Sequence, residues 1–215
     1  MRYSNRALSF GPLIQSIREN RLVLIICLMG FAASLVLFKS INPSLDVFMF
    51  SAINDLGRTW SFLDELIKLI GWLGGDSLWL LLVLFTTLFR QEPRERNTML
   101  LLAAAAAASI VLVSVLKPLF GLPRPSHILA LVNLVVEAPN TPTFPSGHTS
   151  MAFTMAMVVG LRHRRLLAPL LLLAFGTGFA MVYVGVHFVS DVVAGAFLGV
   201  AVGSTMHIFG KRQGL

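Results

Sequence analysis

Three short stretches of the sequence carry residue types that can bind and transfer a phosphoryl group. In the first, KPLFGLPRP, Lys117 and Arg124 flank a turn rich in proline and glycine. Two cations held on a constrained turn suit a phosphate, which lysine meets as a point charge and arginine as a planar fork. Pro118 predicts that the preceding helix ends at Lys117, because proline disfavours helical geometry in the residue before it.

The second stretch, PSGH at 145–148, predicts the start of a helix. Ser146 is a favourable N-cap residue, and Gly147 lets a ligand come close to the backbone. The free N–H groups of the first turn can then face an anion, with His148 in that same turn.

The third stretch, VHFVSD at 186–191, places His187 and Asp191 four residues apart. On a helix this spacing puts both on one face, so that the carboxylate holds one imidazole nitrogen while the other points at a substrate. This is the arrangement of an oriented nucleophile. Taken alone, each stretch has a plainer interpretation, such as an interfacial anchor or a structural hydrogen bond.

Composition indicates where these residues must be positioned. Of 215 residues, 56% are hydrophobic and 13% are charged, and the mean hydropathy is +0.79. In soluble domains about a quarter of the residues are charged, so the sequence predicts an integral membrane protein. The single cysteine, Cys27, excludes a disulfide framework and a cysteine-rich metal site.

The predicted fold is all-α, with six transmembrane helices in a polytopic membrane protein. Apolar stretches that can cross about 30 Å of hydrocarbon lie at 22–38, 78–89, 99–116, 148–161, 166–184 and 188–209. Between the first two, residues 44–73 mix apolar and charged positions, which is typical of an amphipathic segment at the membrane interface. A packing helix with no contact to substrate is the alternative for this segment.

The basic residues predict the orientation. With the amino terminus in the cytoplasm, 12 of the 17 fall on that side, as the positive-inside rule requires. They are Arg2, Arg6, Arg18, Arg21, Arg90, Arg94, Arg96, Arg162, Arg164, Arg165, Lys211 and Arg212. Topology therefore explains the net charge of +7 without a nucleic-acid partner, and it favours two cytoplasmic termini. All three polar stretches then lie on the extracytoplasmic side, which favours a single site.

The three stretches resemble the motifs of the type 2 phosphatidic acid phosphatase superfamily of membrane lipid phosphatases. Its motifs read K-x6-RP, PSGH and SR-x5-H-x3-D, and the first two match completely. The third matches at His187 and Asp191, but Ala180 and Met181 stand where the family has serine and arginine. The resemblance implies one membrane domain over 1–215, with a cytoplasmic leader at 1–21 and catalytic helices within 99–209.

The resemblance also implies a mechanism. His187 would attack the phosphorus to give a phosphohistidine, Asp191 would orient it, and His148 would protonate the leaving group. The phosphoryl oxygens would be held by Lys117, Arg124, Ser146 and Gly147. No metal or other cofactor is implied. The implied partner is a lipid phosphate in the inner membrane, with bacterial undecaprenyl-diphosphate phosphatases as the most similar kind. Phosphatidylglycerophosphate, phosphatidic acid and lipid A phosphate are the alternatives.

Met181 is the main departure from the pattern, since a thioether cannot replace a cationic phosphate contact. Three interpretations follow. The substrate needs fewer contacts, or the protein binds lipid phosphates without turnover, or a neighbouring cation compensates. The candidates for that cation are Lys39, Arg58 and Lys68.

Overall fold

The computed structural model describes residues 11–75, 79 and 93–214, with only the backbone described at 93–97. This part of the chain is helical and contains no strand. The helices up to the first gap are α1 (Gly11–Glu19), α2 (Arg21–Leu35), the π-helical η1 (Val36–Ile41), α3 (Pro43–Thr59), the short η2 (Ser61–Leu63) and α4 (Asp64–Gly74). The helices after it are α6 (Pro93–Phe120), α7 (Pro125–Ile128), α8 (Gly147–Arg162), α9 (Arg164–Tyr183) and α10 (Val189–Gln213).

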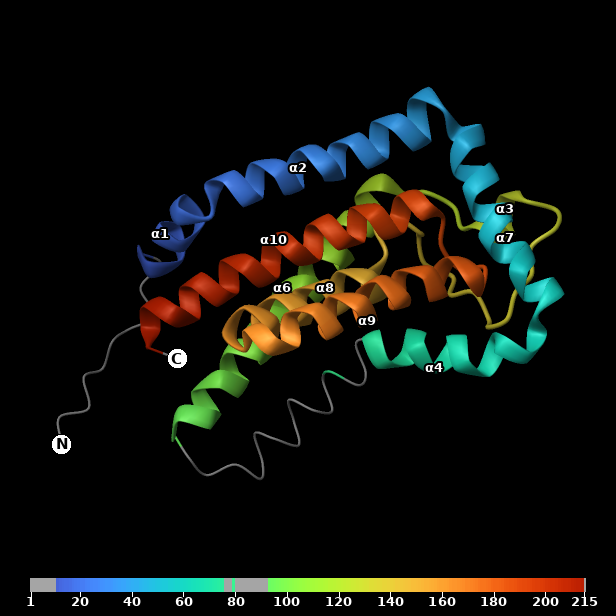
Figure 1. Cartoon of the computed structure of the whole chain (residues 1–215). Helices are drawn as coiled ribbons and strands as arrows, with labels where there is room; N and C mark the ends of the chain where they lie inside the picture. The colour runs from blue at the N-terminus through green and yellow to red at the C-terminus, as the bar shows by residue number, and fades with distance from the viewer. Residues whose placement is uncertain (1–10, 76–78, 80–92, 215) are drawn as a thin grey trace, which may run out of the picture.

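The long helices lie lengthwise beside one another (Figure 1). The helix α10 packs against α8 and α2, and α9 packs against α8 and α4. At one end of this bundle α3 crosses the other helices, and the connecting segments 121–146 and 184–188 gather there. At the other end α1 meets the end of α10, and Arg212 of α10 pairs with Glu19, the last residue of α1.

Four of the described helices are long and apolar enough to cross a bilayer. They span Arg21–Ile41, Thr98–Ile128, Arg164–Tyr183 and Val189–Gln213, and they coincide with four of the predicted spans. The span predicted at 148–161 forms α8, whose 16 residues are fewer than the roughly 20 that a crossing ordinarily needs. The span predicted at 78–89 lies outside the described residues, apart from Trp79.

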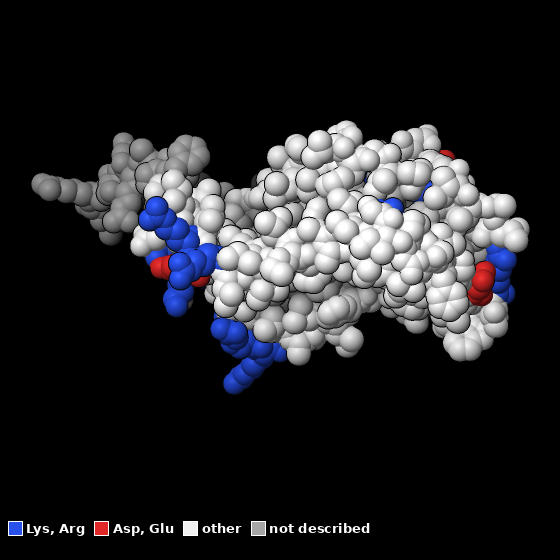
Figure 2. Space-filling model, turned by 90° about the horizontal axis from the view of Figure 1, so that it is seen from above, with Lys and Arg blue, Asp and Glu red and all other residues white. Residues whose placement is uncertain are grey.

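Charge is distributed as in a membrane protein. Most of the lysine, arginine and acidic side chains on the face shown in Figure 2 lie near its two ends, and between them only a few blue atoms are visible, in a hollow of an otherwise uncharged surface. On α2 large apolar side chains such as Leu22, Ile25 and Leu28 are exposed. Their exposure fits contact with lipid, because lipid tails solvate apolar side chains as well as a protein core does.

A glycine seam joins α8 and α10, which run parallel. It consists of Gly195, Gly199 and Gly203, spaced four residues apart on the face of α10 toward α8. A Cβ atom at these positions would overlap backbone carbonyl oxygens of the neighbouring segment, those of Ser146, Ser150 and Thr154 in turn. The seam lets the two backbones touch, as small residues do in other membrane helix pairs.

The segment predicted as one amphipathic unit at 44–73 forms two helices, α3 and α4, that pack against α9. The buried face of α3 includes Asn54, which is 1% exposed. Its amide donates to the carbonyl oxygens of Asn133 and Tyr183, each at 2.8 Å, and its Oδ1 accepts the N–H of Asn133. This helix therefore ties the connecting segment after α7 to the end of α9. An interfacial position for 44–73 stays a prediction.

The predicted end of the third helix at Lys117 is wrong. The helix α6 continues through Pro118 to Phe120, because a proline near a helix end removes a single backbone hydrogen bond and only biases the residue before it. Gly121 ends the helix instead. It adopts a left-handed φ of 57° and donates its N–H to the Lys117 carbonyl at 2.9 Å, as glycine does at many helix C-termini.

Candidate active site

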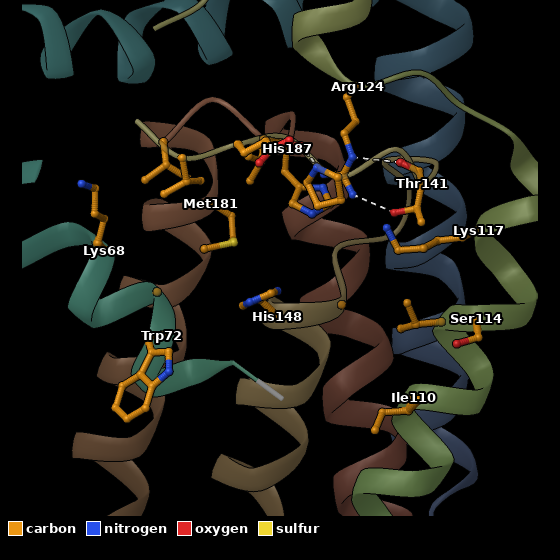
Figure 3. Close-up of a pocket in the computed structure, with 18 of the residues that line it drawn as sticks. Lys68, Trp72, Ile110, Ser114, Lys117, Arg124, Thr141, His148, Met181 and His187 are labelled. Carbon is orange, nitrogen blue, oxygen red and sulfur yellow. Dashed lines mark hydrogen bonds between the residues drawn. The ribbon is translucent and has the colours of Figure 1, made fainter. Parts of the chain in front are cut away.

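A cavity of about 450 Å³ opens at the end of the bundle that α3 crosses. Its wall includes five of the seven residues predicted for the site, namely Lys117, Arg124, Gly147, His148 and His187. In Figure 3 the polar ends of Lys117 and Arg124 lie near His187, and His148 faces the same space from α8. The other two predicted residues, Ser146 and Asp191, are buried directly behind this wall.

Arg124, in the turn after α6, is held rigidly by residues of two other connecting segments. Its Nε and Nη2 donate to Thr141, at 2.9 Å to the carbonyl and 3.1 Å to the hydroxyl (Figure 3), and its Nη1 donates to the carbonyl of Val186 at 2.8 Å. Arginine has five N–H donors, so these three bonds fix the plane of the guanidinium and leave two donors for a ligand. The Lys117 ammonium donates to the Pro142 carbonyl at 2.5 Å. Both cations are therefore placed before any ligand binds.

The PSGH stretch begins α8 as predicted, with Ser146 at the N-cap. Its side chain does not cap the helix, however. The Ser146 Oγ accepts the hydroxyl of Thr149 at 3.0 Å, while the Ser146 N–H donates to the carbonyl of Asp191 at 3.0 Å. Because Ser146 is fully buried behind the wall, Gly147 and His148 form the part of this stretch that faces the cavity.

His187 and Asp191 do not share a helix, which corrects the predicted geometry. The helix α10 begins at Val189, and His187 lies in the turn before it. Gly185 reverses the chain in that turn with a left-handed φ of 87°, a conformation that glycine adopts without strain. Asp191 lies in the first turn of α10, where its Oδ2 accepts the N–H of Phe188 at 2.8 Å. The two side chains nevertheless approach, with His187 Nδ1 3.4 Å from Asp191 Oδ2.

Thr143 lies between the two, and sequence reasoning missed it. Its hydroxyl is 3.1 Å from His187 Nδ1 and 2.5 Å from Asp191 Oδ2. Thr143 is fully buried, and its N–H donates to the carbonyl of Leu122 at 2.9 Å. A polar residue two positions before PSGH was the available signal, but no motif singled it out.

Lys39 supports the carboxylate from the opposite side. Its ammonium lies 2.8 Å from Asp46 Oδ2 and 3.4 Å from Asp191 Oδ1. Asp46 is itself 2% exposed and accepts the N–H and hydroxyl of Ser190. Lys39 is thus committed to two buried carboxylates and is not part of the cavity wall.

Of the three cations predicted as substitutes for the missing arginine, only Lys68 is part of the cavity wall. Arg58 pairs with Asp55 at 3.6 Å on the surface. Lys68 projects from α4. This helix packs closely against Met181, as shown by Gly71 of α4, where an added Cβ atom would lie 2.8 Å from the Met181 methyl group. Figure 3 shows Met181 between Lys68 and His187.

Burial sets the protonation state of His187. It lowers the pKa of this imidazole to about 4, an effect that outweighs the opposing pull of Asp191, and the nearby charges of Arg124 and Lys117 lower it further. His187 is therefore neutral at physiological pH, with a lone pair on one ring nitrogen.

Within the described part of the chain, no group of three or more His, Cys, Asp or Glu side chains could hold a metal ion.

Comparisons with known proteins identify a family for this chain. Residues 98–214 match the sequence model of the family described as "PAP2 superfamily". The chain is 29% identical over 163 residues to "Bacitracin transport permease protein BcrC" of Bacillus licheniformis, which covers 76% of this chain and 77% of that protein. It is 30% identical over 81 residues to "Undecaprenyl-diphosphatase BcrC" of Bacillus subtilis, a match that covers 38% of this chain and 42% of that protein.

One solved structure has a similar fold over almost the whole chain. It is the first transmembrane PAP2 type phosphatidylglycerolphosphate phosphatase from Bacillus subtilis, with a TM-score of 0.72 and 23% identity. The match covers 95% of this chain and 98% of that one. The helices before residue 98, which the family model does not reach, thus belong to the shared fold.

Proposed function

The chain belongs to the PAP2 superfamily and is a membrane lipid phosphatase, and on this premise we propose that it removes the terminal phosphate of undecaprenyl diphosphate through a phosphohistidine. The observation that carries the mechanism is the placement of His187. One ring nitrogen is held by Thr143 and Asp191, while the ring borders a cavity that also holds Lys117, Arg124 and His148. The substrate is favoured by the activity in the name of one relative.

In the first step, the lone pair of His187 Nε2 attacks the terminal phosphorus. The bond from phosphorus to the leaving oxygen breaks, and that oxygen takes a proton from His148. Lys117 and Arg124 bind the phosphoryl oxygens, and the N–H groups at the start of α8, next to Gly147, face the same anion. Ser146 supports the site from behind the wall, because its N–H donates to the Asp191 carbonyl and its hydroxyl accepts from Thr149.

In the second step, water attacks the phosphohistidine. His148, now neutral, takes a proton from this water, the P–N bond breaks, and inorganic phosphate leaves with His187 restored. The same two histidines thus serve both halves of the reaction, and no step requires a metal ion.

Apolar wall residues such as Trp72, Ile110 and Val113 suit the first part of a lipid chain.

The test of this function is phosphate release by the purified protein from a panel of lipids. The panel contains undecaprenyl diphosphate, phosphatidylglycerophosphate, phosphatidic acid and lipid A phosphate, each with and without a chelator. We expect the highest kcat/KM for undecaprenyl diphosphate and no effect of the chelator. A higher kcat/KM for any other lipid would identify that lipid as the preferred substrate in place of undecaprenyl diphosphate. A loss of activity with the chelator would contradict the metal-free mechanism.

The pH dependence tests the nucleophile. His187 attacks only when neutral, and its neutral form predominates above its pKa of about 4. We therefore expect phosphorylation of His187 to remain fast down to about pH 5 and to fall about tenfold for each pH unit below 4. The measurement is the single-turnover rate of phosphoenzyme formation, corrected for the separately measured ionisation of the substrate. A midpoint near 6.5, the ordinary value for histidine, would contradict it.

We also propose the full topology predicted from the sequence, as one domain with six spans, two cytoplasmic termini and an extracytoplasmic site. Three features support it. The first and last helices, α1 and α10, meet where Glu19 pairs with Arg212. The cavity lies at the other end of the bundle. The basic residues are divided as the positive-inside rule requires.

Thiol labelling tests this orientation. In a Cys27→Ser background, a cysteine replacing the exposed loop residue Asn140 is expected to react with a membrane-impermeant reagent in intact cells. A cysteine at His163, an exposed residue at the opposite end, is expected to react only after permeabilisation. The reverse pattern would invert the topology.

A further inference from the structure

We propose that Thr143 fixes the tautomer of His187 and thereby makes Nε2 the nucleophilic atom. This inference rests on the proposed function of His187. It assigns to Thr143 the role of a positioning residue, because Thr143 acts through the imidazole and is not part of the cavity wall.

The argument begins with the charge on Asp191. This carboxylate is fully buried, and Lys39 lies 3.4 Å from its Oδ1. Burying a carboxylate ion is costly unless an opposite charge lies beside it. Lys39 supplies that charge, so Asp191 is ionised. An ionised carboxylate only accepts hydrogen bonds. Its Oδ2 accordingly accepts from the N–H of Phe188 and from the hydroxyl of Thr143.

The hydroxyl of Thr143 has one hydrogen, and Asp191 takes it. At 2.5 Å from Asp191 Oδ2, the oxygen of Thr143 must be the donor of this bond. Toward His187 Nδ1, which lies 3.1 Å away, the same oxygen can then only accept. The hydrogen of the neutral imidazole is therefore on Nδ1, and the lone pair is on Nε2.

Distance favours Thr143 over Asp191 as the direct partner of the ring. The separation of Nδ1 from the threonine oxygen is 3.1 Å, against 3.4 Å to the nearest carboxylate oxygen. Thr143 is also held firmly. The next residue, Phe144, is fully buried with its ring packed against Phe31 and Phe120. The hydroxyl thus has little freedom to leave the ring.

Two substitutions separate the hydroxyl from the bulk of the side chain. Thr143→Val keeps the shape and removes the hydroxyl, whereas Thr143→Ser keeps the hydroxyl. We expect Thr143→Val to lower kcat by about 10- to 100-fold with KM changed by less than about threefold. In other histidine-dependent enzymes the wrong tautomer costs about 10⁴-fold, and the loss here is smaller because Asp191 remains near Nδ1. Thr143→Ser should retain activity within about threefold.

A second measurement does not depend on turnover. The ¹⁵N chemical shifts of the His187 ring distinguish the two neutral tautomers. We expect the Nδ1–H form in the wild type and in Thr143→Ser, and an increased Nε2–H population in Thr143→Val. An Nε2–H wild type would overturn the proposal even if the enzyme is active. If the wild type has the Nδ1–H form but releases no phosphate, the result would support the tautomer proposal and contradict the proposed function. Equal activity of the valine and wild-type proteins, or equal losses in both variants, would also overturn it.

Discussion

Replacing His187 with alanine is expected to abolish phosphate release, with a loss of at least about 10⁴-fold in kcat. Without the nucleophile no phosphoenzyme can form, and only binding and electrostatic stabilisation remain. Turnover of a lipid phosphate measures the loss. Incorporation of ³²P from labelled substrate into protein, in a bond that survives base and breaks in acid, measures the intermediate. The wild type should incorporate the label, and His187→Ala should not.

His163→Ala is the matched control, because this histidine is exposed at the opposite end of the bundle. It should release phosphate at the wild-type rate. Equal unfolding temperatures of the two variants would show that the His187 effect is chemical. Label on the protein of His187→Ala, at the wild-type level, would assign the nucleophile to another residue.

Lys68→Met is expected to lower kcat/KM by about 10- to 100-fold, because Lys68 is the cation placed beside Met181 on the cavity wall. Losing a charge-assisted contact to the reacting group costs about 10²- to 10³-fold in a dry site. The Lys68 side chain is 35% exposed, so solvent screening places the effect at the low end. Its pairing with Glu65, at 2.8 Å on the surface, is weak enough for a phosphate to displace.

A double-mutant cycle with Met181→Arg makes the test specific. In the wild type, Met181→Arg should change kcat/KM by less than about threefold or lower it, since a second cation would crowd a contact already made. In the Lys68→Met background the same arginine should restore activity by about tenfold or more. Arg58→Met is the control, because Arg58 pairs with Asp55 outside the cavity, and it should have no effect. A gain of about 10²-fold from Met181→Arg alone would show that nothing replaces the family arginine.

The sequence was sufficient to predict the elements that follow one-dimensional rules. Apolar length predicted the spans that became α2, α6, α9 and α10, and the PSGH motif predicted the start of α8 at Gly147. Five predicted site residues border one cavity, because each motif lies within a few residues of a helix end and these ends meet on one side of the bundle. Where such a rule is only a bias, as for Pro118, the prediction failed.

The supporting residues could not be predicted, because their roles depend on contacts between distant segments. Thr143 reaches a histidine 44 positions later, and Asp46 bonds to a serine 144 positions later. Buried polar residues of this kind have no periodicity or spacing to mark them. The relation between His187 and Asp191 shows the same limit. The spacing predicted the contact, but through a shared helical face that the structure does not contain.

The glycine seam between α8 and α10 has a mechanical consequence. His148 lies in the first turn of α8 and Asp191 in the first turn of α10. The seam below them therefore determines the distance between the proposed acid and the carboxylate that supports the proposed nucleophile. Backbone touches backbone there, at positions that extend about 12 Å along the helix axis from Gly195 to Gly203. Such a contact contains no layer of side chains that could be compressed. A rise in the lateral pressure of the bilayer should therefore displace the exposed α2 and leave the spacing of the reacting groups unchanged.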